Sequence, residues 1–318
     1  MTSNAGLLSV GGVSCLTAMT LAAVTAILPE PYMDEIFHIP QAQKYCYGKF
    51  KEWDDKITTL PGLYIVTVGI LNPISQWTGE MFCDPIHLRA INVVMSSLIC
   101  LILQRVTFQI HGNKHFFDGS KSLLSSINLT FFPLLYFFNF LYYTDVGSTF
   151  MVLLMYCLHL DRRDWFAACI GVLAVLFRQT NIIWVAFVAV QSLGPYFLHT
   201  IHGLQLEEAH RLKNGSRDQP PKFSLTSSGQ AVEVFEGLYR LAFIYPGRGV
   251  TLLQHSLRVA GGYLLVGVGF VAFVILNGGI VVGDRSAHTA TFHPMQVWPP
   301  DFIIFGFIFY CIHSSTQR

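Results

Sequence analysis

Residues 6–38 read GLLSVGGVSCLTAMTLAAVTAILPEPYMDEIFH, an uncharged apolar run followed closely by two adjacent carboxylates. As a helix rising about 1.5 Å per residue, the run Gly6–Leu28 is long enough to cross the roughly 30 Å hydrocarbon core of a bilayer. It lacks a basic leading segment and a small-residue cleavage site, so we expect an uncleaved signal-anchor. Asp34 and Glu35 would then stand just outside the first span, where charges often mark chemistry. This arrangement indicates a membrane enzyme acting on a lipid-linked substrate.

The composition of the whole chain supports a membrane protein. Of the 318 residues, 52% are hydrophobic and only 12% are charged, whereas soluble domains carry roughly 25% charged residues. The mean hydropathy is +0.47. The net charge of +1 gives no argument for a nucleic-acid partner. The 12 histidines are scattered without a metal-binding spacing, so we expect no metal ion.

Further uncharged runs predict the other spans, about seven to nine in all. These runs are Ile57–Gly79, Ala90–Leu103, Ser122–Thr144, Val146–Leu160, Trp165–Phe177, Gln179–Leu206, Val259–Gly283 and Phe302–Gln317. Backbone groups in hydrocarbon must be paired within the segment, so the runs must be helices. The expected fold is an all-α polytopic protein with one membrane domain over residues 1–318.

Two longer segments lie between spans. Pro29–Lys56 contains apolar positions typical of an amphipathic helix over Glu35–Phe50, lying on the membrane surface and interrupted by Pro40. Glu207–Leu257 is rich in Lys and Arg, which favours the cytoplasm. The turn 161–164 would share that side, with Pro29–Lys56 and Arg178 on the other. Strict alternation of every run conflicts with this assignment, so one of the intermediate runs is expected either not to cross or to be re-entrant.

Several polar residues next to the apolar runs are candidates for chemistry. Asp34 or Glu35 could act as a general base, but Asp34 could equally cap a helix. Trp53 could stack on a sugar ring, and Asp54 and Asp55 could bind its hydroxyls, although an ordinary polar loop with an interfacial Trp is the favoured alternative. An aromatic belt explains Tyr143.

An aromatic belt does not explain the neighbouring Asp145, which is a charge between two apolar runs. Arg178 stands alone between two further runs. Its planar fork suits a phosphate, although a snorkelling Arg is as good an interpretation. Asp284 and His288 could form a polar lip, or an ordinary turn. Among the 7 cysteines, Cys46 and Cys83 look extramembrane, and a disulfide between them is left open.

Five stretches, taken in order, carry a resemblance to a known family. They are PYMDEIFHIPQAQKYC, WDDKITTLPGLY, LYYTD, FRQTNIIWV and NGGIVVGDRSAH, within residues 21–293. They resemble the eukaryotic dolichyl-phosphate-glucose α-1,2-glucosyltransferases of the endoplasmic reticulum membrane. Those enzymes add the last glucose to the lipid-linked oligosaccharide used for N-glycosylation, and they have a GT-C-type fold with a luminal active site.

The resemblance implies roles for individual residues. It places the base at Asp34, with Glu35 second, and a phosphate contact at Arg178. Further substrate contacts are expected at His38, Trp53, Asp54, Tyr143, Asp145, Gln179, Asn181, Asp284 and His288. The implied partners are the donor dolichyl-phosphate glucose, the dolichol-linked oligosaccharide and the bilayer, with no cofactor.

The family continues with further spans, whereas this chain ends in the polar tail HSSTQR. A shortened form is therefore expected. An alternative is an inactive paralogue or isoform that regulates a membrane partner such as an ion channel. A transporter is a third interpretation, because Asp145 and Arg178 would also suit a substrate pathway.

Overall fold

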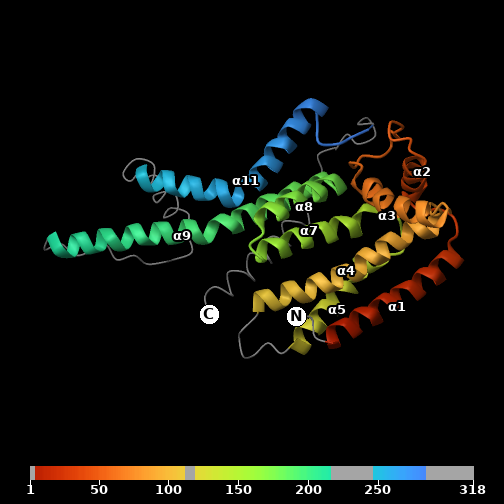
Figure 1. Ribbon diagram of the computed structural model, residues 1–318, viewed down its shortest axis with the longest axis horizontal. Coiled ribbons are helices and arrows are strands. Elements are labelled where there is room, and N and C mark those ends of the chain that lie inside the picture. The colour runs from red at the N-terminus through yellow and green to blue at the C-terminus, as the bar shows by residue number, and fades with distance from the viewer. Residues whose placement is uncertain (1–3, 112–118, 216–245, 284–318) are drawn as a thin grey trace, which may run out of the picture. The chain divides into compact units, whose positions relative to one another are not determined.

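A computed structural model describes residues 4–111, 119–215 and 246–283, and every regular element in these ranges is helical. Residues 1–282 form one compact unit. The elements are α1 (Asn4–Ile27), α2 (Glu35–Cys46), α3 (Gly62–Thr78), α4 (Pro85–His111), α5 (Gly119–Thr130), α6 (Pro133–Phe138), α7 (Thr144–Leu160), α8 (Asp164–Phe177), the 3-10 turn η1 (Gln179–Asn181), α9 (Ile182–Gly215) and α11 (Pro246–Asn277) (Figure 1). The all-α prediction is confirmed for this part of the chain. The predicted run Phe302–Gln317 lies outside the described residues.

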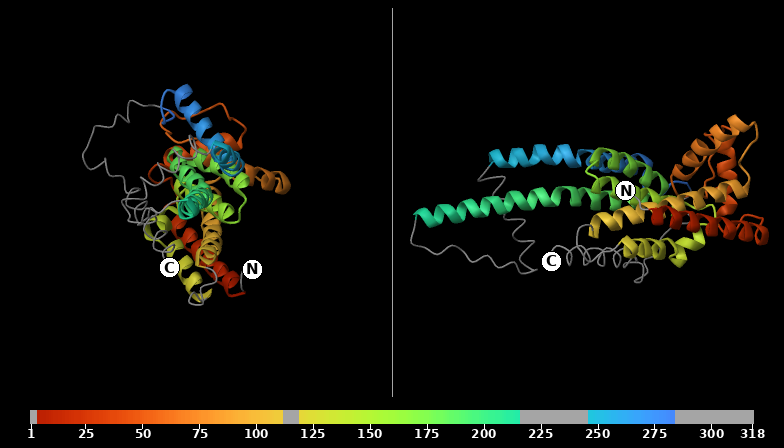
Figure 2. Two further views of the ribbon diagram at one scale, coloured as in Figure 1. Left: turned by 90° about the vertical axis from the view of Figure 1, so that its left-hand side faces the viewer. Right: turned by 60° about the horizontal axis from the view of Figure 1, so that its bottom comes forward.

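The long helices of this unit run between two ends, here called the α2 end and the turn end (Figures 1 and 2). At the α2 end, Arg89 in the first turns of α4 donates a hydrogen bond from Nη1 to the carbonyl of Leu28, just after α1, at 2.8 Å. At the turn end, Arg105 near the end of α4 pairs with Asp161 in the turn between α7 and α8. The helices α1, α4, α7 and α8 therefore each connect the two ends.

The segment from α5 to residue 141 runs back along α4. Ser122 Oγ donates to the carbonyl of Gln104 at 3.3 Å, and Asn139 Nδ2 donates to Ser96 Oγ at 2.8 Å. The prediction of one unbroken helix over Ser122–Thr144 is wrong. Pro133 lacks an N–H and forces the preceding residue out of the helical region, so α6 starts a new helix.

The helix α3 begins and ends at the α2 end. At its start, the backbone at Gly62 lies so close to Leu176, in the last turn of α8, that a Cβ atom would be 2.5 Å from the Leu176 carbonyl carbon. Shortly after its end, Cys83 is disulfide-bonded to Cys46 of α2, and α4 then begins. The predicted span Ile57–Gly79 is therefore wrong. It is the run that does not cross, which removes the conflict in the predicted topology.

Four of the described helices are long and apolar enough to cross a membrane by length and composition: Val10–Ile27, Pro85–Ile110, Gln179–Phe197 and Gly247–Asn277. The helices α7 and α8 are apolar but shorter. The helix α4 is longer than its predicted span, Ala90–Leu103. The predicted span stops at charged residues, whereas the helix includes Arg89 and Arg105, each of which has a carboxylate partner.

The helix α2 does not lie on a surface as predicted. Ile39, Ala42 and Tyr45 are buried in a core shared with residues of α3 and α4. The helix also continues through Pro40 and ends shortly before Gly48, whose φ of 76° is unfavourable for other residues. Burial of α2 fixes the positions of the residues at its start, which include the acidic pair.

Candidate active site

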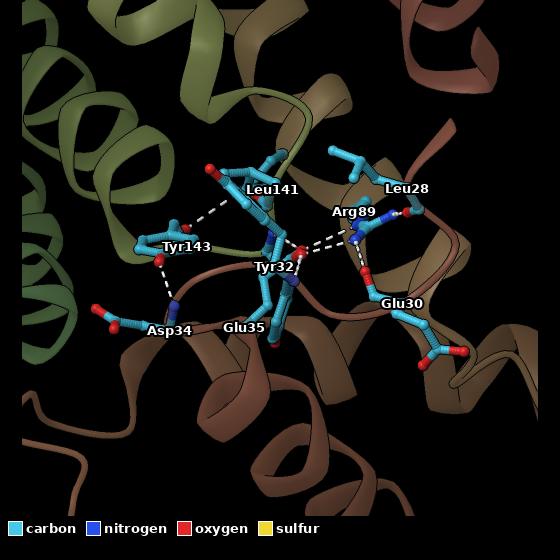
Figure 3. Close-up of polar contacts among 10 residues, drawn as sticks. Leu28, Glu30, Tyr32, Asp34, Glu35, Arg89, Leu141 and Tyr143 are labelled. Carbon is cyan, nitrogen blue, oxygen red and sulfur yellow. Dashed lines mark hydrogen bonds and ion pairs between the residues drawn. The ribbon is translucent and has the colours of Figure 1, made fainter. Parts of the chain in front are cut away.

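A buried ion pair joins the start of α2 to α4. Arg89 donates from Nε and Nη2 to the two carboxylate oxygens of Glu35, at 2.9 and 2.7 Å, and neither side chain is exposed (Figure 3). The same carboxylate accepts hydrogen bonds from the backbone N–H of Tyr142 at 2.6 Å and of Tyr32 at 3.0 Å. The Glu35 carboxylate is thus enclosed by donors and faces the protein interior.

The guanidinium of Arg89 also holds the segment between α1 and α2. Besides the Leu28 contact, Nη2 donates to the carbonyl of Glu30 at 3.1 Å. Arg89 is not among the residues that the sequence predicts for the site, because it stands at the edge of an apolar run. A signal for it exists in the sequence, since a charge next to an apolar run needs a partner and the acidic pair Asp34-Glu35 offers one.

Asp34 has a different environment, although it is the next residue along the chain. Asp34 occupies the N-cap position of α2, as the cap interpretation predicts, but its exposed side chain makes no capping hydrogen bond. Its backbone N–H donates to the hydroxyl of Tyr143 at 2.5 Å. The preceding residue, Met33, has a φ of 55°, which is strained for a residue with a side chain. The structure therefore presents the Asp34 carboxylate to the outside.

His38 lies between two tyrosines, one helical turn after Asp34. Its Nδ1 is 2.5 Å from the hydroxyl of Tyr64, and its ring meets the ring of Tyr143 edge-on at 5.6 Å. Burial lowers the pKa of His38, and the negative charges of Asp34 and Asp145 oppose that shift. A neutral imidazole is thus held beside the acidic groups.

Asp145 and Arg178 form an ion pair. Asp145 is in the first turn of α7, and Arg178 follows α8 with an extended backbone. The expectation that Arg178 stands alone is wrong, because the chain brings the two helix ends together. The Arg178 side chain is still 44% exposed, so part of its guanidinium is accessible. Asp145 comes two residues after Tyr143, whose hydroxyl accepts the Asp34 N–H, so the ion pair lies at the same end of the bundle as Asp34.

Two residues near Arg178 that are predicted to contact substrate form hydrogen bonds within the protein instead. Gln179 Nε2 donates to the carbonyl of Thr58 at 2.9 Å. Asn181 Nδ2 donates to Ser148 Oγ and to the carbonyl of Ala174, both at 2.7 Å. Both side chains are buried. They fix η1, and with it the position of Arg178.

Two residues of the loop after α2 that are predicted to contact a sugar, Trp53 and Asp54, make contacts within the protein. The ring of Trp53 meets the ring of Tyr64 edge-on at 5.8 Å, and its Nε1 is buried without a hydrogen-bond partner. Asp54 Oδ1 accepts a hydrogen bond from the N–H of Lys56 at 3.0 Å. Asp284 and His288 lie outside the described residues. In the described ranges, no group of three His, Cys, Asp or Glu side chains could hold a metal ion.

Two features define the class of this protein. Apolar helices long enough to cross a membrane carry a polar cluster at one end, and that end also bears the Cys46–Cys83 disulfide. The chain is a multi-pass, all-helical membrane protein. Residues 28–317 match the DIE2/ALG10 family, and the chain belongs to that family, a family of GT-C membrane glycosyltransferases.

Curated relatives carry the name Dol-P-Glc:Glc(2)Man(9)GlcNAc(2)-PP-Dol alpha-1,2-glucosyltransferase. The chain is 36% identical to a human protein of this name over 93% of its own length and 59% of the relative's. It is 38% identical to a rat protein over the same shares, and 34% identical to one from Arabidopsis thaliana over 92% and 63%. The chain thus spans about three fifths of the length of these relatives. No solved structure matches it.

Proposed function

We propose that the protein transfers glucose from dolichyl-phosphate glucose to the 2-hydroxyl of the terminal glucose on the dolichol-linked oligosaccharide. Family membership supports the reaction class, and the names of the relatives state both substrates. The observation that carries the proposal is the polar cluster at the α2 end. There the exposed Asp34 donates its N–H to Tyr143, and two residues further on Asp145 pairs with the partly exposed Arg178.

The chemistry of an inverting transfer needs two groups from the protein. A base takes the proton from the acceptor hydroxyl while its oxygen attacks the anomeric carbon of the donor. The bond to the phosphate then breaks, and the phosphate leaves with the electron pair and with negative charge that a cation can stabilise. Asp34 is the proposed base and Arg178 the proposed phosphate contact. A phosphate leaves readily, so no general acid is required.

The same end of the bundle is proposed to face the lumen of the endoplasmic reticulum. Disulfides persist in oxidising compartments such as the lumen and are rare in the cytosol, and Cys46–Cys83 lies at the α2 end. The basic residues Arg162 and Arg163 lie in the α7–α8 turn at the opposite end, which agrees with the preference of Lys and Arg for the cytoplasm. Both signals give the same orientation.

The proposal is tested with the full-length protein expressed in cells that lack their own terminal glucosyltransferase. Microsomes are supplied with labelled dolichyl-phosphate glucose, and the dolichol-linked oligosaccharides are separated by size. We expect the oligosaccharide with two glucoses to gain a third, sensitive to an α-1,2-glucosidase. If the protein is inserted at normal levels and no third glucose appears, the proposed function is wrong.

A further inference from the structure

We infer that Glu35 and Arg89 are a pair of positioning residues that set the place of Asp34 and Tyr143, and that Glu35 does not itself act as a base. The inference rests on the proposed function for what the site does. It assigns different roles to two carboxylates that are adjacent in sequence. The argument depends on where each carboxylate points and on what the buried pair holds.

The buried pair connects separate parts of the chain. Through Arg89 it holds the carbonyls of Leu28 and Glu30, which follow α1. On the other side of the pair, the Glu35 carboxylate accepts a hydrogen bond from the backbone N–H of Tyr142, which lies just before α7. The segment after α1, the start of α2, the first turns of α4 and the segment before α7 therefore meet at one ion pair (Figure 3).

The proposed base and one expected substrate contact are the immediate neighbours of these anchor points. Asp34 precedes Glu35, and Tyr143 follows Tyr142. The two neighbours are also joined directly, by the hydrogen bond from the Asp34 N–H to the Tyr143 hydroxyl. Movement of either anchor would therefore displace the Asp34 backbone or the Tyr143 ring, and small misplacements of catalytic groups are costly to rate.

The surroundings of Glu35 argue against a role as base. Its carboxylate has no exposed surface and already accepts four hydrogen bonds, two of them from a guanidinium. These donors occupy the oxygen lone pairs that would otherwise accept a proton from the substrate. Asp34 is exposed and lacks a side-chain bond to the helix. The two carboxylates thus differ in access to a substrate.

The first test measures position without reference to activity. Hydrogen exchange is compared in the membrane-inserted full-length protein for wild type, Glu35→Gln and Arg89→Lys. Lys keeps the charge of Arg89 but loses its planar fork, so it is the milder change. We expect exchange in peptides covering 30–38 and 139–145 to become about tenfold faster or more, with peptides of α8 unchanged.

A matched control is Arg105→Gln, which removes an ion pair at the turn end, and we expect it to leave both peptides unchanged. Unchanged exchange at 30–38 and 139–145 in both pair variants would overturn the inference. The inference would also be overturned if both variants exchanged faster in all peptides, including those of α8. The ion pair would then stabilise the whole fold and would not position these two segments in particular.

The second test measures the pH dependence of glucose transfer per inserted molecule. We expect Glu35→Gln to lower kcat about tenfold or more with little change in KM for the donor, and to keep the fall in rate at low pH that reports the base. A profile that becomes flat at low pH in Glu35→Gln would identify Glu35 as the base and overturn the inference. If the wild type transfers no glucose, the proposed function fails, while the exchange experiment still decides whether the pair positions these segments.

Discussion

The backbone N–H of Asp34 donates a hydrogen bond to the hydroxyl of Tyr143, across a separation of 109 residues in sequence. The bond fixes the residue that precedes α2 against the residue that precedes α7, and it leaves the Asp34 carboxylate exposed. Tyr143 is buried, and this burial raises its pKa. The hydroxyl therefore stays neutral at physiological pH and remains a hydrogen-bonding group beside the proposed base.

Asp34→Asn should lower glucose transfer by a factor on the order of 10² or more, because the amide cannot take the proton from the acceptor hydroxyl. The side chain is exposed and makes no capping hydrogen bond, so the amount of inserted protein should hardly change. Transfer is measured in microsomes and normalised to inserted protein. Asp84→Asn, at an exposed carboxylate just before α4, is the control and should behave as wild type. Near-normal transfer by Asp34→Asn would exclude Asp34 as the base.

The ion pair between Asp145 and Arg178 predicts a graded series of variants. Arg178→Ala should lose nearly all transfer, whereas Arg178→Lys should keep part of it, because Lys retains the charge but cannot bind two phosphate oxygens at once. Asp145→Asn should have a smaller effect, since Arg178 keeps its charge and loses only its orientation. Specific activity per inserted molecule is the measurement. Equal specific activity for wild type and Arg178→Ala would end the phosphate hypothesis.

The disulfide between Cys46 and Cys83 predicts a loss of stability when it is removed. It closes a loop with a sequence separation of 37 residues, for which the entropy of the unfolded chain suggests a contribution of about 2–4 kcal/mol. Cys46→Ser with Cys83→Ser should therefore lower the Tm of the purified protein in detergent, as should a reducing agent. Cys169→Ser, at an exposed free cysteine, is the control. An unchanged Tm in the double variant would show that the bond does not stabilise the fold.

The orientation of the bundle predicts which glycosylation sequons are used. Asn214 is in the last turn of α9, which runs away from the α2 end (Figure 1), and Asn128 is within α5. Both should lack a glycan. Lys56→Asn creates an Asn-Ile-Thr sequon in the loop at the α2 end, and it should be modified in the lumen. A glycosidase-sensitive mass shift mapped to Asn214 would reverse the proposed orientation.

His38 predicts a loss of stability in mild acid. Burial lowers its pKa below the ordinary value of 6.5, so the unfolded chain binds a proton that the folded protein does not. Stability is then independent of this group above the ordinary pKa and decreases as the pH falls below it. The Tm of wild type should fall between about pH 7 and pH 5 by more than that of His38→Gln, which cannot titrate. Parallel decreases in the two proteins would show that other groups cause the effect.

Local composition was enough to predict that this is a membrane protein, that it is helical, and that the acidic pair stands just outside the first span. A charge-free run has no alternative in a bilayer but to form a helix, so Gly6–Leu28 could be assigned from length alone. The two cysteines outside the apolar runs were also recognised, although the bond between them required the structure. Charge in the predicted cytoplasmic segments gave an orientation that agrees with the position of the disulfide.

The partners of the charged residues required the tertiary structure. Arg89 lies 54 residues from Glu35, and Arg178 lies 33 residues from Asp145, and no local pattern relates such distant positions. The same holds for α3, whose apolar sequence resembles a span but whose ends are held at one end of the bundle by contacts with α8 and by the disulfide before α4. The sequence by itself determined which segments are helical, because hydrophobicity and backbone hydrogen bonding act locally. Only the tertiary structure decided that Glu35 is buried and Asp34 exposed, because the solvation of a carboxylate depends on which distant donors the fold brings to it.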